Sequence, residues 1–227
     1  MLSIIIPTFD EAASINQLLA AVAKISEPVE VIVVDGGSGD ETAQIVRRHG
    51  LRLIGSERGR GAQMHAGACA SRGEVLWFLH ADTQPAPESA RHISEALRDP
   101  HVVGGNFNVS FDSARFAVRF LTWLYRQLRR LGLCYGDSAI FVRRETYDRA
   151  GGFKPFPIFE DLDLVRRLRK DGRLVELPKG VITSSRRFEG RFFMTFARWT
   201  FLQMLYWAGV DPRTLGKLYL AIREPKF

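Results

Sequence analysis

Two stretches of sequence decide the fold: Ser-Ile-Ile-Ile-Pro-Thr-Phe-Asp-Glu (3–11) and Val-Ile-Val-Val-Asp-Gly-Gly-Ser-Gly-Asp (31–40). Each begins with an unbroken apolar run and ends in polar residues, and the residues between the two stretches have a helical pattern. Continuous apolar runs are typical of strands buried on both faces, as in parallel sheets with crossover helices. The two stretches therefore predict a β-α-β unit whose polar residues follow the strand ends.

The same alternation continues through the first hundred residues. Strands are expected at 2–6, 30–34, 51–54 and 74–79, with helices at 11–24, 40–49, 61–71 and 87–97. After residue 100 the pattern becomes mixed, with strands expected at 102–111, 138–142 and 180–185 and helices at 114–131, 144–150, 159–170 and 191–206. We therefore predict one α/β domain with a Rossmann-like, mostly parallel sheet, flanking helices and a mixed α+β second half packed on the first.

The composition and the net charge of the chain indicate which classes of binding partner to expect. Lys and Arg outnumber Asp and Glu by 32 to 25, giving a formal net charge of +7. This charge favours an anionic partner, which leaves nucleic acid, an acidic lipid surface and a phosphorylated small molecule. No zinc-finger spacing, RNP-type motif or lysine-rich tail is present, so we expect no nucleic-acid partner. The two cysteines, Cys69 and Cys134, are expected to be buried free thiols.

The location of the protein is predicted from its apolar segments. The N-terminus has no basic region before its short apolar run, which is therefore not a signal peptide. No stretch of about 20 residues is free of charge, so a membrane-spanning helix is not expected. We predict a cytoplasmic protein, with peripheral attachment to the cytoplasmic membrane face as an alternative.

The turn after the first strand tests two common classes of α/β nucleotide-binding protein. A dinucleotide-binding fold needs GxGxxG at this turn, but the sequence reads Thr-Phe-Asp-Glu, without glycine. The glycines follow the second strand instead, at 36, 37 and 39, and lack the required spacing. No GxxxxGK[ST] is present either. A nicotinamide-dependent dehydrogenase and a P-loop protein are therefore excluded.

Polar residues follow three of the expected strands, at Thr8–Glu11, Asp35–Asp40 and His80–Thr83. In open α/β sheets, ligands bind beyond the carboxyl ends of the strands, near the point where strand order reverses. For any one of these ends a helix N-cap is the simpler explanation, because Ser, Thr and Asp commonly precede helices. Three such ends on one sheet edge favour a binding site. Asp35 and Asp82 are expected to end neighbouring strands.

The ordered set of motifs resembles family 2 glycosyltransferases over about residues 2–190. The matching segments are Ile-Ile-Pro-Thr-Phe-Asp-Glu (5–11), Val-Val-Asp-Gly-Gly-Ser-Gly-Asp-Glu-Thr (33–42), Phe-Leu-His-Ala-Asp-Thr (78–83), Gly-Asp-Ser-Ala-Ile-Phe-Val-Arg-Arg (136–144), Gly-Gly-Phe (151–153) and Phe-Glu-Asp-Leu-Asp-Leu (159–164). The resemblance implies a GT-A fold and an inverting mechanism. It also implies a nucleotide-diphosphate sugar donor, for which UDP is the expected nucleotide, and Mn²⁺ or Mg²⁺ as cofactor.

The resemblance also divides the single domain, 1–227, by function. About 1–100 is the expected nucleotide-sugar-binding half, about 101–190 the acceptor and catalytic half, and about 191–227 a pair of C-terminal helices. The acceptor itself is an unidentified hydroxyl, on a sugar or on a lipid-linked molecule. Positions matching the family's donor-binding residues are Pro7, Thr8, Glu11, Asp35, Arg58, Arg60, Gln63, His80, Ala81, Asp82, Arg186 and Arg187.

The hydrogen-bonding capacity and the charge of these side chains are consistent with the expected roles in donor binding. The family places the residue matching Asp35 on uracil, and a carboxylate accepts hydrogen bonds from base N–H groups well. Arg58 and Arg60 would offset phosphate charge, with a solvated loop as the alternative. Arg186 and Arg187 resemble a basic loop that closes over the donor diphosphate.

His80 and Asp82 occupy the positions of the family's DXD motif, with His where the first Asp usually stands. Residues two apart in an extended segment face the same side, so both are expected to point at the metal site. A hard dication prefers carboxylate oxygen, which makes Asp82 the expected direct ligand. His80 is the second candidate ligand, and a contact to ribose or to a metal-bound water is its alternative role.

Glu160 and Asp161 stand where the family keeps its general base. Inversion requires a carboxylate to take the proton of the acceptor hydroxyl, and the family pattern gives this role to Asp161. Glu160 and Asp137 are the expected acceptor contacts. The alternative is that both acids at 160–161 only stabilise a helix N-terminus.

A basic amphipathic helix is expected at 114–131. Its arginines share one side and its large apolar residues the other: Arg115, Arg119, Arg126, Arg129 and Arg130 against Phe116, Phe120, Leu124, Leu128 and Leu131. The helix either docks on the core or lies on an anionic membrane surface, which the aromatic segment 191–206 would extend. Two other functions stay open: a nucleotidyltransferase acting on a sugar phosphate, and a non-enzymatic membrane-binding module.

Overall fold

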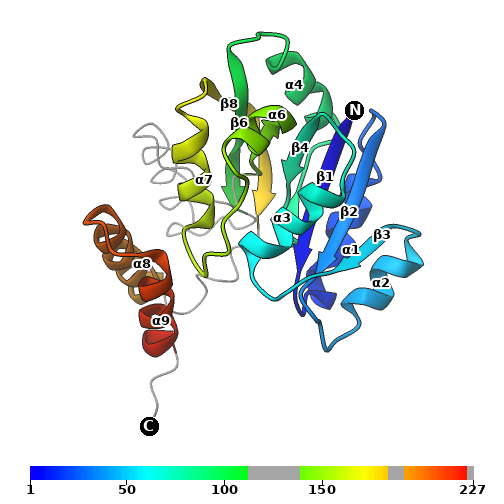
Figure 1. Ribbon diagram of the computed structural model, residues 1–227. Coiled ribbons are helices and arrows are strands. Elements are labelled where there is room, and N and C mark those ends of the chain that lie inside the picture. The colour runs from blue at the N-terminus through cyan, green and yellow to red at the C-terminus, as the bar shows by residue number, and fades with distance from the viewer. Residues whose placement is uncertain (112–138, 184–191, 224–227) are drawn as a thin grey trace.

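The computed structural model describes residues 1–111, 139–183 and 192–223, and its centre is an eight-stranded sheet in the order β3-β2-β1-β4-β7-β6-β8-β5 (Figure 1). The strands are β1 (Leu2–Thr8), β2 (Val29–Asp35), β3 (Arg52–Gly55), β4 (Val75–Phe78), β5 (Thr83–Gln84), β6 (Val102–Phe111), β7 (Phe141–Arg143) and β8 (Arg173–Thr183). The helices are α1 (Ala12–Val22), α2 (Thr42–Arg48), α3 (Arg60–Ala70), α4 (Ser89–Ala96), α6 (Arg144–Arg149), α7 (Glu160–Leu168), α8 (Phe192–Trp207) and α9 (Pro212–Arg223).

The first four strands are parallel and follow the predicted β-α-β order. β1 pairs with β2 on one side and with β4 on the other. Strand order therefore reverses between β1 and β4, and this is where an open α/β sheet binds its ligand. The arrangement corrects one expectation: Asp35 and Asp82 do not follow neighbouring strands, because β1 lies between β2 and β4.

The apolar runs of the strands serve two cores, one on each face of the sheet. Ile4 and Ile6 pack with α1, α2 and α4 on one face, whereas Ile5 packs with α3 and α7 on the other. This alternation follows from the period of two in a strand, and burial on both faces explains why the runs are continuously apolar. All three isoleucine side chains are fully buried.

The second half of the chain is mixed α+β, as predicted, and its strands extend the same sheet. β7 pairs antiparallel with β4, and β6 and β8 continue the sheet beyond β7. The strand predicted at 180–185 is the end of a longer strand, β8, which starts at Arg173. The predicted helix at 114–131 lies outside the described residues.

The C-terminal helices α8 and α9 form a pair to one side of the sheet (Figure 1). They share a small core with the start of α7 and the two residues before it: Ile158, Phe159 and Leu162 pack with Leu202 and Leu215. Among the described residues, no helix is both long and apolar enough to cross a membrane. Cys69 on α3 is an exposed free thiol, so its predicted burial is wrong.

Candidate active site

The loops that follow β1 and β2 are bound to each other by their polar side chains. Asp10 Oδ1 accepts a hydrogen bond from the Gly39 N–H (2.8 Å), and Asp40 Oδ2 accepts one from the Ala12 N–H at the start of α1 (3.0 Å). Asp10 holds a left-handed backbone conformation (φ 52°), which is uncommon for a residue other than glycine. The helix-capping alternative is therefore right in part, but the cap of α1 comes from the neighbouring loop.

Asp35 organises the turn that follows β2. Its Oδ2 accepts hydrogen bonds from the N–H groups of Gly37 (3.1 Å) and Ser38 (3.0 Å), and its Oδ1 accepts one from Ser38 Oγ (2.5 Å). The carboxylate is half-buried. Its Oδ1 also accepts a hydrogen bond from Thr8 Oγ1 (3.4 Å), so four hydrogen bonds fix the carboxylate in place.

Gln63 is buried beside the ends of β1 and β2 and is not exposed at this edge of the sheet. Its amide nitrogen donates to the backbone oxygens of Thr8 (2.7 Å) and Val34 (2.9 Å), and the residue is only 3% exposed. Gly59 N–H donates to its Oε1 (3.3 Å). The side chain therefore ties α3 to the ends of β1 and β2, and it supports the site from below. Pro7 and Thr8 are likewise buried in β1.

Arg58 lies over an aromatic side chain in the loop that follows β1. Its guanidinium lies 3.9 Å from the ring centroid of Phe9, in the geometry of a cation–π contact. Arg58 is exposed and Phe9 is half-buried. Glu11, also predicted here, is half-buried and accepts a hydrogen bond from Ser14 Oγ (2.5 Å). Sequence reasoning missed Phe9, because only the tertiary structure brings Arg58 over its ring.

The segment after β4 is a tight turn, which corrects the expectation of an extended conformation. The Thr83 N–H donates to the His80 carbonyl oxygen (3.0 Å), closing a four-residue turn through Ala81 and Asp82. In such a turn, residues two apart do not share a face, unlike those in a strand. His80 is 7% exposed and Ala81 3%, whereas Asp82 is half-buried. Asp82 is therefore the more accessible of the two candidate ligands.

The donor set at this turn fits a metal ion that takes most of its ligands from a substrate. Within the ranges that the structure describes, no three His, Cys, Asp or Glu side chains are grouped to hold a metal ion. Mg²⁺ commonly binds through one or two carboxylates, with substrate phosphates and water completing the shell. A single accessible carboxylate at Asp82 suits that arrangement.

The N-terminus of α7 carries the two candidate acids and lies next to the N-terminus of α3. Phe159, just before the helix, has a left-handed backbone (φ 61°), which costs an L-residue about 1–2 kcal/mol and must be stabilised by its surroundings. Glu160 is buried and forms an ion pair with Arg60 on α3 (Nε–Oε1 3.6 Å). Asp161 is 8% exposed, and its Oδ1 accepts a hydrogen bond from the Leu162 N–H (2.8 Å). The two acids thus have different partners.

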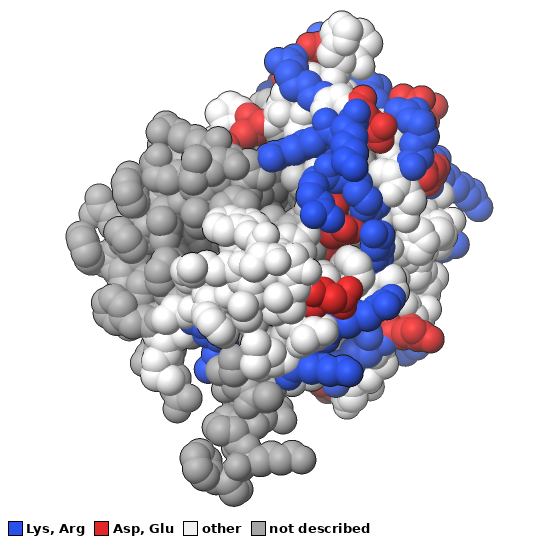
Figure 2. Space-filling view, turned by 60° about the vertical axis from the view of Figure 1, so that its left-hand side comes forward, with Lys and Arg blue, Asp and Glu red and all other residues white. Residues whose placement is uncertain are grey.

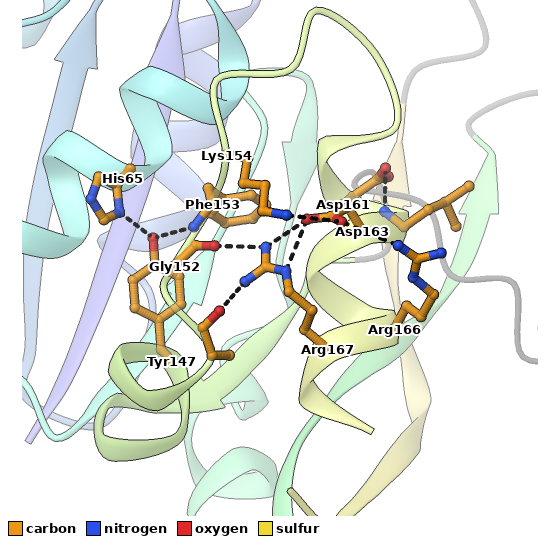
Figure 3. A network of polar contacts seen from close by, with 11 residues as sticks. His65, Tyr147, Gly152, Phe153, Lys154, Asp161, Asp163, Arg166 and Arg167 are labelled. Atoms are coloured by element: carbon orange, nitrogen blue, oxygen red, sulfur yellow. Dashed lines mark hydrogen bonds and ion pairs between the residues drawn. The ribbon is translucent and has the colours of Figure 1, made fainter. Parts of the chain in front are cut away.

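A polar network behind these acids fixes α7 to the loop before it (Figure 3). Asp163, whose side chain is 4% exposed, binds Arg167 (Nη2–Oδ2 2.7 Å) and also pairs with Lys154 (3.7 Å) and Arg166 (3.7 Å). Arg167 Nη2 in turn donates to the Gly152 carbonyl oxygen (2.7 Å). The i,i+4 spacing of Asp163 and Arg167 was a signal in the sequence that could have revealed this pair.

The network continues toward α3 through a buried tyrosine. Tyr147 Oη accepts a hydrogen bond from the Phe153 N–H (3.0 Å) and lies 3.0 Å from His65 Nδ1 (Figure 3). Burial raises the pKa of Tyr147 above its ordinary value, so its hydroxyl stays protonated. Residues from α3, α6 and α7 are therefore joined behind the candidate site.

The two adjacent arginines of α7 are expected to contribute very differently to stability. Arg167→Met leaves the buried Asp163 without its closest partner and should lower the free energy of unfolding by about 3 kcal/mol. Arg166→Gln removes a partner whose side chain is 71% exposed and should cost no more than about 1 kcal/mol. Urea unfolding of both variants measures the difference. Equal losses would contradict a stabilising role for the Arg167 pair.

Gly61 permits the close approach of α3 to the loop before α7. A Cβ at this position would lie 2.2 Å from the Lys154 carbonyl oxygen. Backbone atoms cannot move aside cheaply, so Gly61→Ala should destabilise the protein by about 1–3 kcal/mol. Gly55→Ala is the matched control, because a Cβ there meets nothing within 4 Å. If urea unfolding gives both variants the same stability, the close packing described for Gly61 is wrong.

Known proteins resemble this chain in sequence. The sequence profile described as Glycosyl transferase family 2 matches residues 3–152, well over half of the chain. The chain belongs to glycosyl transferase family 2. A curated relative, the undecaprenyl-phosphate 4-deoxy-4-formamido-L-arabinose transferase of Aeromonas hydrophila, is 32% identical over 117 residues. That match covers 46% of this chain and 36% of the relative, so this family 2 chain spans little more than a third of the relative's length.

Two solved structures show that this family 2 member has the predicted GT-A fold. The mannosyltransferase PcManGT from Pyrobaculum calidifontis, in complex with GDP-Man and Mn²⁺, superposes with a TM-score of 0.69 at 22% identity. The superposition covers 92% of this chain and 64% of the PcManGT chain. TarS of S. aureus, in complex with UDP-GlcNAc, gives a TM-score of 0.68 at 20% identity, covering 82% of this chain and 58% of TarS.

Three predicted site residues of this family 2 member, Asp137, Arg186 and Arg187, lie outside the described residues. The last described residue before the two arginines is Thr183, which pairs across the sheet with Thr83. Thr83 directly follows Asp82. The end of β8 therefore lies beside the turn that carries the candidate metal ligand.

Proposed function

We propose that this family 2 glycosyltransferase transfers a sugar, with inversion, from a nucleotide-diphosphate sugar to a hydroxyl acceptor, using Mn²⁺ or Mg²⁺. One observation carries the proposal. The ends of β1, β2 and β4 share an edge of the sheet with the N-termini of α3 and α7, which are linked by the Arg60–Glu160 ion pair. This common edge supports a single site containing Asp35, Asp82 and Asp161.

The donor nucleotide would bind over the ends of β1 and β2. Asp35, held by the turn that it organises, would accept hydrogen bonds from the base, and UDP is the nucleotide that we propose. Arg58 and Arg60, at the start of α3, would offset diphosphate charge. The GT-A neighbours were solved with UDP-GlcNAc and with GDP-Man, so the fold accommodates both a uridine and a guanosine donor.

Asp82 would hold the metal, with His80 as a weaker candidate because it is nearly buried. A bound divalent cation stabilises the negative charge that develops on the departing diphosphate. Mn²⁺ in the PcManGT complex supports use of a divalent ion, and does not choose between Mn²⁺ and Mg²⁺ for this chain.

Asp161 would take the proton of the acceptor hydroxyl as this oxygen attacks the anomeric carbon. Glu160 is engaged by Arg60, which supports giving it an acceptor-positioning role. The name of the Aeromonas relative specifies undecaprenyl phosphate as acceptor. We therefore propose that the acceptor hydroxyl belongs to a lipid-linked molecule, and that the chain associates peripherally with the membrane that contains it.

A donor screen tests this function directly. The purified chain is incubated with a panel of nucleotide-diphosphate sugars and Mn²⁺, and release of the nucleoside diphosphate is followed by chromatography. We expect slow hydrolysis of at least one UDP-sugar, lost when EDTA removes the metal. A chain that neither hydrolyses a nucleotide sugar nor binds UDP in calorimetry would not be the proposed enzyme.

A further inference from the structure

α8 presents apolar side chains on two opposite sides. Among the described residues, the large hydrophobic side chains that are exposed gather on the C-terminal helices, with Met1 as the exception. On α8 they are Met194 (62% exposed), Phe201 (50%), Met204 (60%) and Trp207 (57%), and on α9 Leu220 (56%). The spacing 194, 201 and 204 places these α8 residues along one side of the helix.

The other side of α8 is packed against the entry to α7. Leu202 is fully buried, and the rings of Trp199 and Tyr206 lie 6.1 Å and 5.0 Å from the ring of Phe159. Phe159 directly precedes Glu160 and Asp161. A helix that is apolar all round is normally covered on both sides. The exposed apolar side of α8 therefore has no packing partner among the described residues. It is opposite the side that contacts Phe159, the residue before the candidate catalytic acids.

The charge around this surface favours an anionic bilayer as its cover. α8 contains no acidic residue, and residues 192–223 contain Arg198, Arg213, Lys217 and Arg223 against Asp211. Figure 2 shows a broad uncharged surface on this face, bordered by Lys and Arg side chains and by fewer Asp and Glu side chains. Exposed Phe, Trp and Met next to basic residues are the composition of helices that lie in a membrane interface. The chain as a whole carries a formal charge of +7.

We propose that the exposed side of α8, together with Leu220 of α9, docks on an anionic membrane surface. The helix would lie in the plane of the interface with Phe201, Met204 and Trp207 inserted among the lipids. Because the opposite side of α8 contacts Phe159, docking holds Glu160 and Asp161 close to the membrane plane, where the headgroup of a lipid-linked acceptor is found. This last step rests on the acceptor class given under the proposed function; the docking itself does not.

Vesicle sedimentation of the whole chain tests the docking surface. We use phosphatidylcholine vesicles with and without about a third phosphatidylglycerol. Wild type should sediment with the anionic vesicles, and added salt should weaken this binding because it screens the basic residues. Phe201→Gln/Met204→Gln should lower the partition coefficient by about tenfold or more, since two apolar side chains no longer enter the interface.

The matched control adds two glutamines elsewhere on the protein. Ala13 and Ala20 are exposed on α1, on the opposite side of the molecule from α8 (Figure 1), and Ala13→Gln/Ala20→Gln should sediment like wild type. Both double variants should unfold at the wild-type temperature, because all four side chains are exposed. Failure of wild type to bind anionic vesicles, or unchanged binding by the α8 variant, would overturn the proposal.

Light scattering addresses the competing occupant, a second copy of this chain. A dimer that the α8 double variant dissociates would overturn membrane docking in favour of self-association. UDP binding with Mn²⁺ is measured on the same samples without vesicles. If wild type binds UDP but not anionic vesicles, only the docking surface is rejected. If wild type binds the vesicles but not UDP, only the proposed enzyme is rejected.

Discussion

Asp161→Asn is expected to bind UDP and Mn²⁺ like wild type while transferring sugar about 10²–10⁴ times more slowly, the usual cost of losing a general base. Asparagine keeps the size of the side chain, and its oxygen can still accept the hydrogen bond that the Leu162 N–H donates to Asp161 Oδ1. What is lost is the ability to take a proton. Single-turnover transfer to the acceptor, compared with calorimetric UDP binding, separates the two effects.

Glu160→Gln is the matched control for this experiment. Glu160 is held by Arg60 on α3, and neighbouring residues of a helix point about 100° apart, so both acids cannot face one hydroxyl. The variant should lose its ion pair and part of its acceptor affinity, with a milder loss of rate. If Glu160→Gln is inactive and Asp161→Asn retains activity, the base has been assigned to the wrong carboxylate.

Asp82→Ala is expected to abolish the enhancement of UDP binding by Mn²⁺. Asp82 is the half-buried carboxylate of the turn after β4, whereas the neighbouring His80 is almost fully buried. Removing the only accessible carboxylate of this turn leaves the metal with substrate phosphates and water alone. Calorimetric titration of UDP, with Mn²⁺ and with EDTA, measures the enhancement directly.

Asp35→Ala provides the comparison for the metal experiment. Asp35 follows β2, with β1 between it and β4, and its carboxylate organises the turn at Gly37 and Ser38. This variant should bind UDP more weakly in both conditions yet keep the ratio between them. An intact Mn²⁺ enhancement in Asp82→Ala would show that another group binds the metal.

Much of the site was predictable because its signals are local. An apolar run ending in Thr8 or Asp35 indicates a buried strand followed by a polar loop, whatever lies elsewhere in the chain. Parallel strands carry these ends to one edge, so the edge itself followed from the β-α-β order. The ordered motifs resembled the correct family and the GT-A fold for the same reason.

Other features were missed because they depend on contacts between distant segments. The turn at His80–Thr83 was predicted as extended, since Ala and Asp at its centre occur in both conformations. The position of β1 between β2 and β4, and the full length of β8, are matters of strand order and pairing that no local pattern specifies. Phe9 became part of the site only through the approach of Arg58.

The sequence by itself therefore determined most of the strands, their polar ends and the family. Tertiary structure decided which partners the acids have: Glu160 is paired with Arg60, and Asp163 with Arg167 and Lys154. It also decided that α8 is buried on one side and exposed on the other, although both sides are apolar in the sequence. The physical reason is that periodicity reports how often apolar residues recur along one element, whereas burial and ion pairing depend on which other elements pack against it.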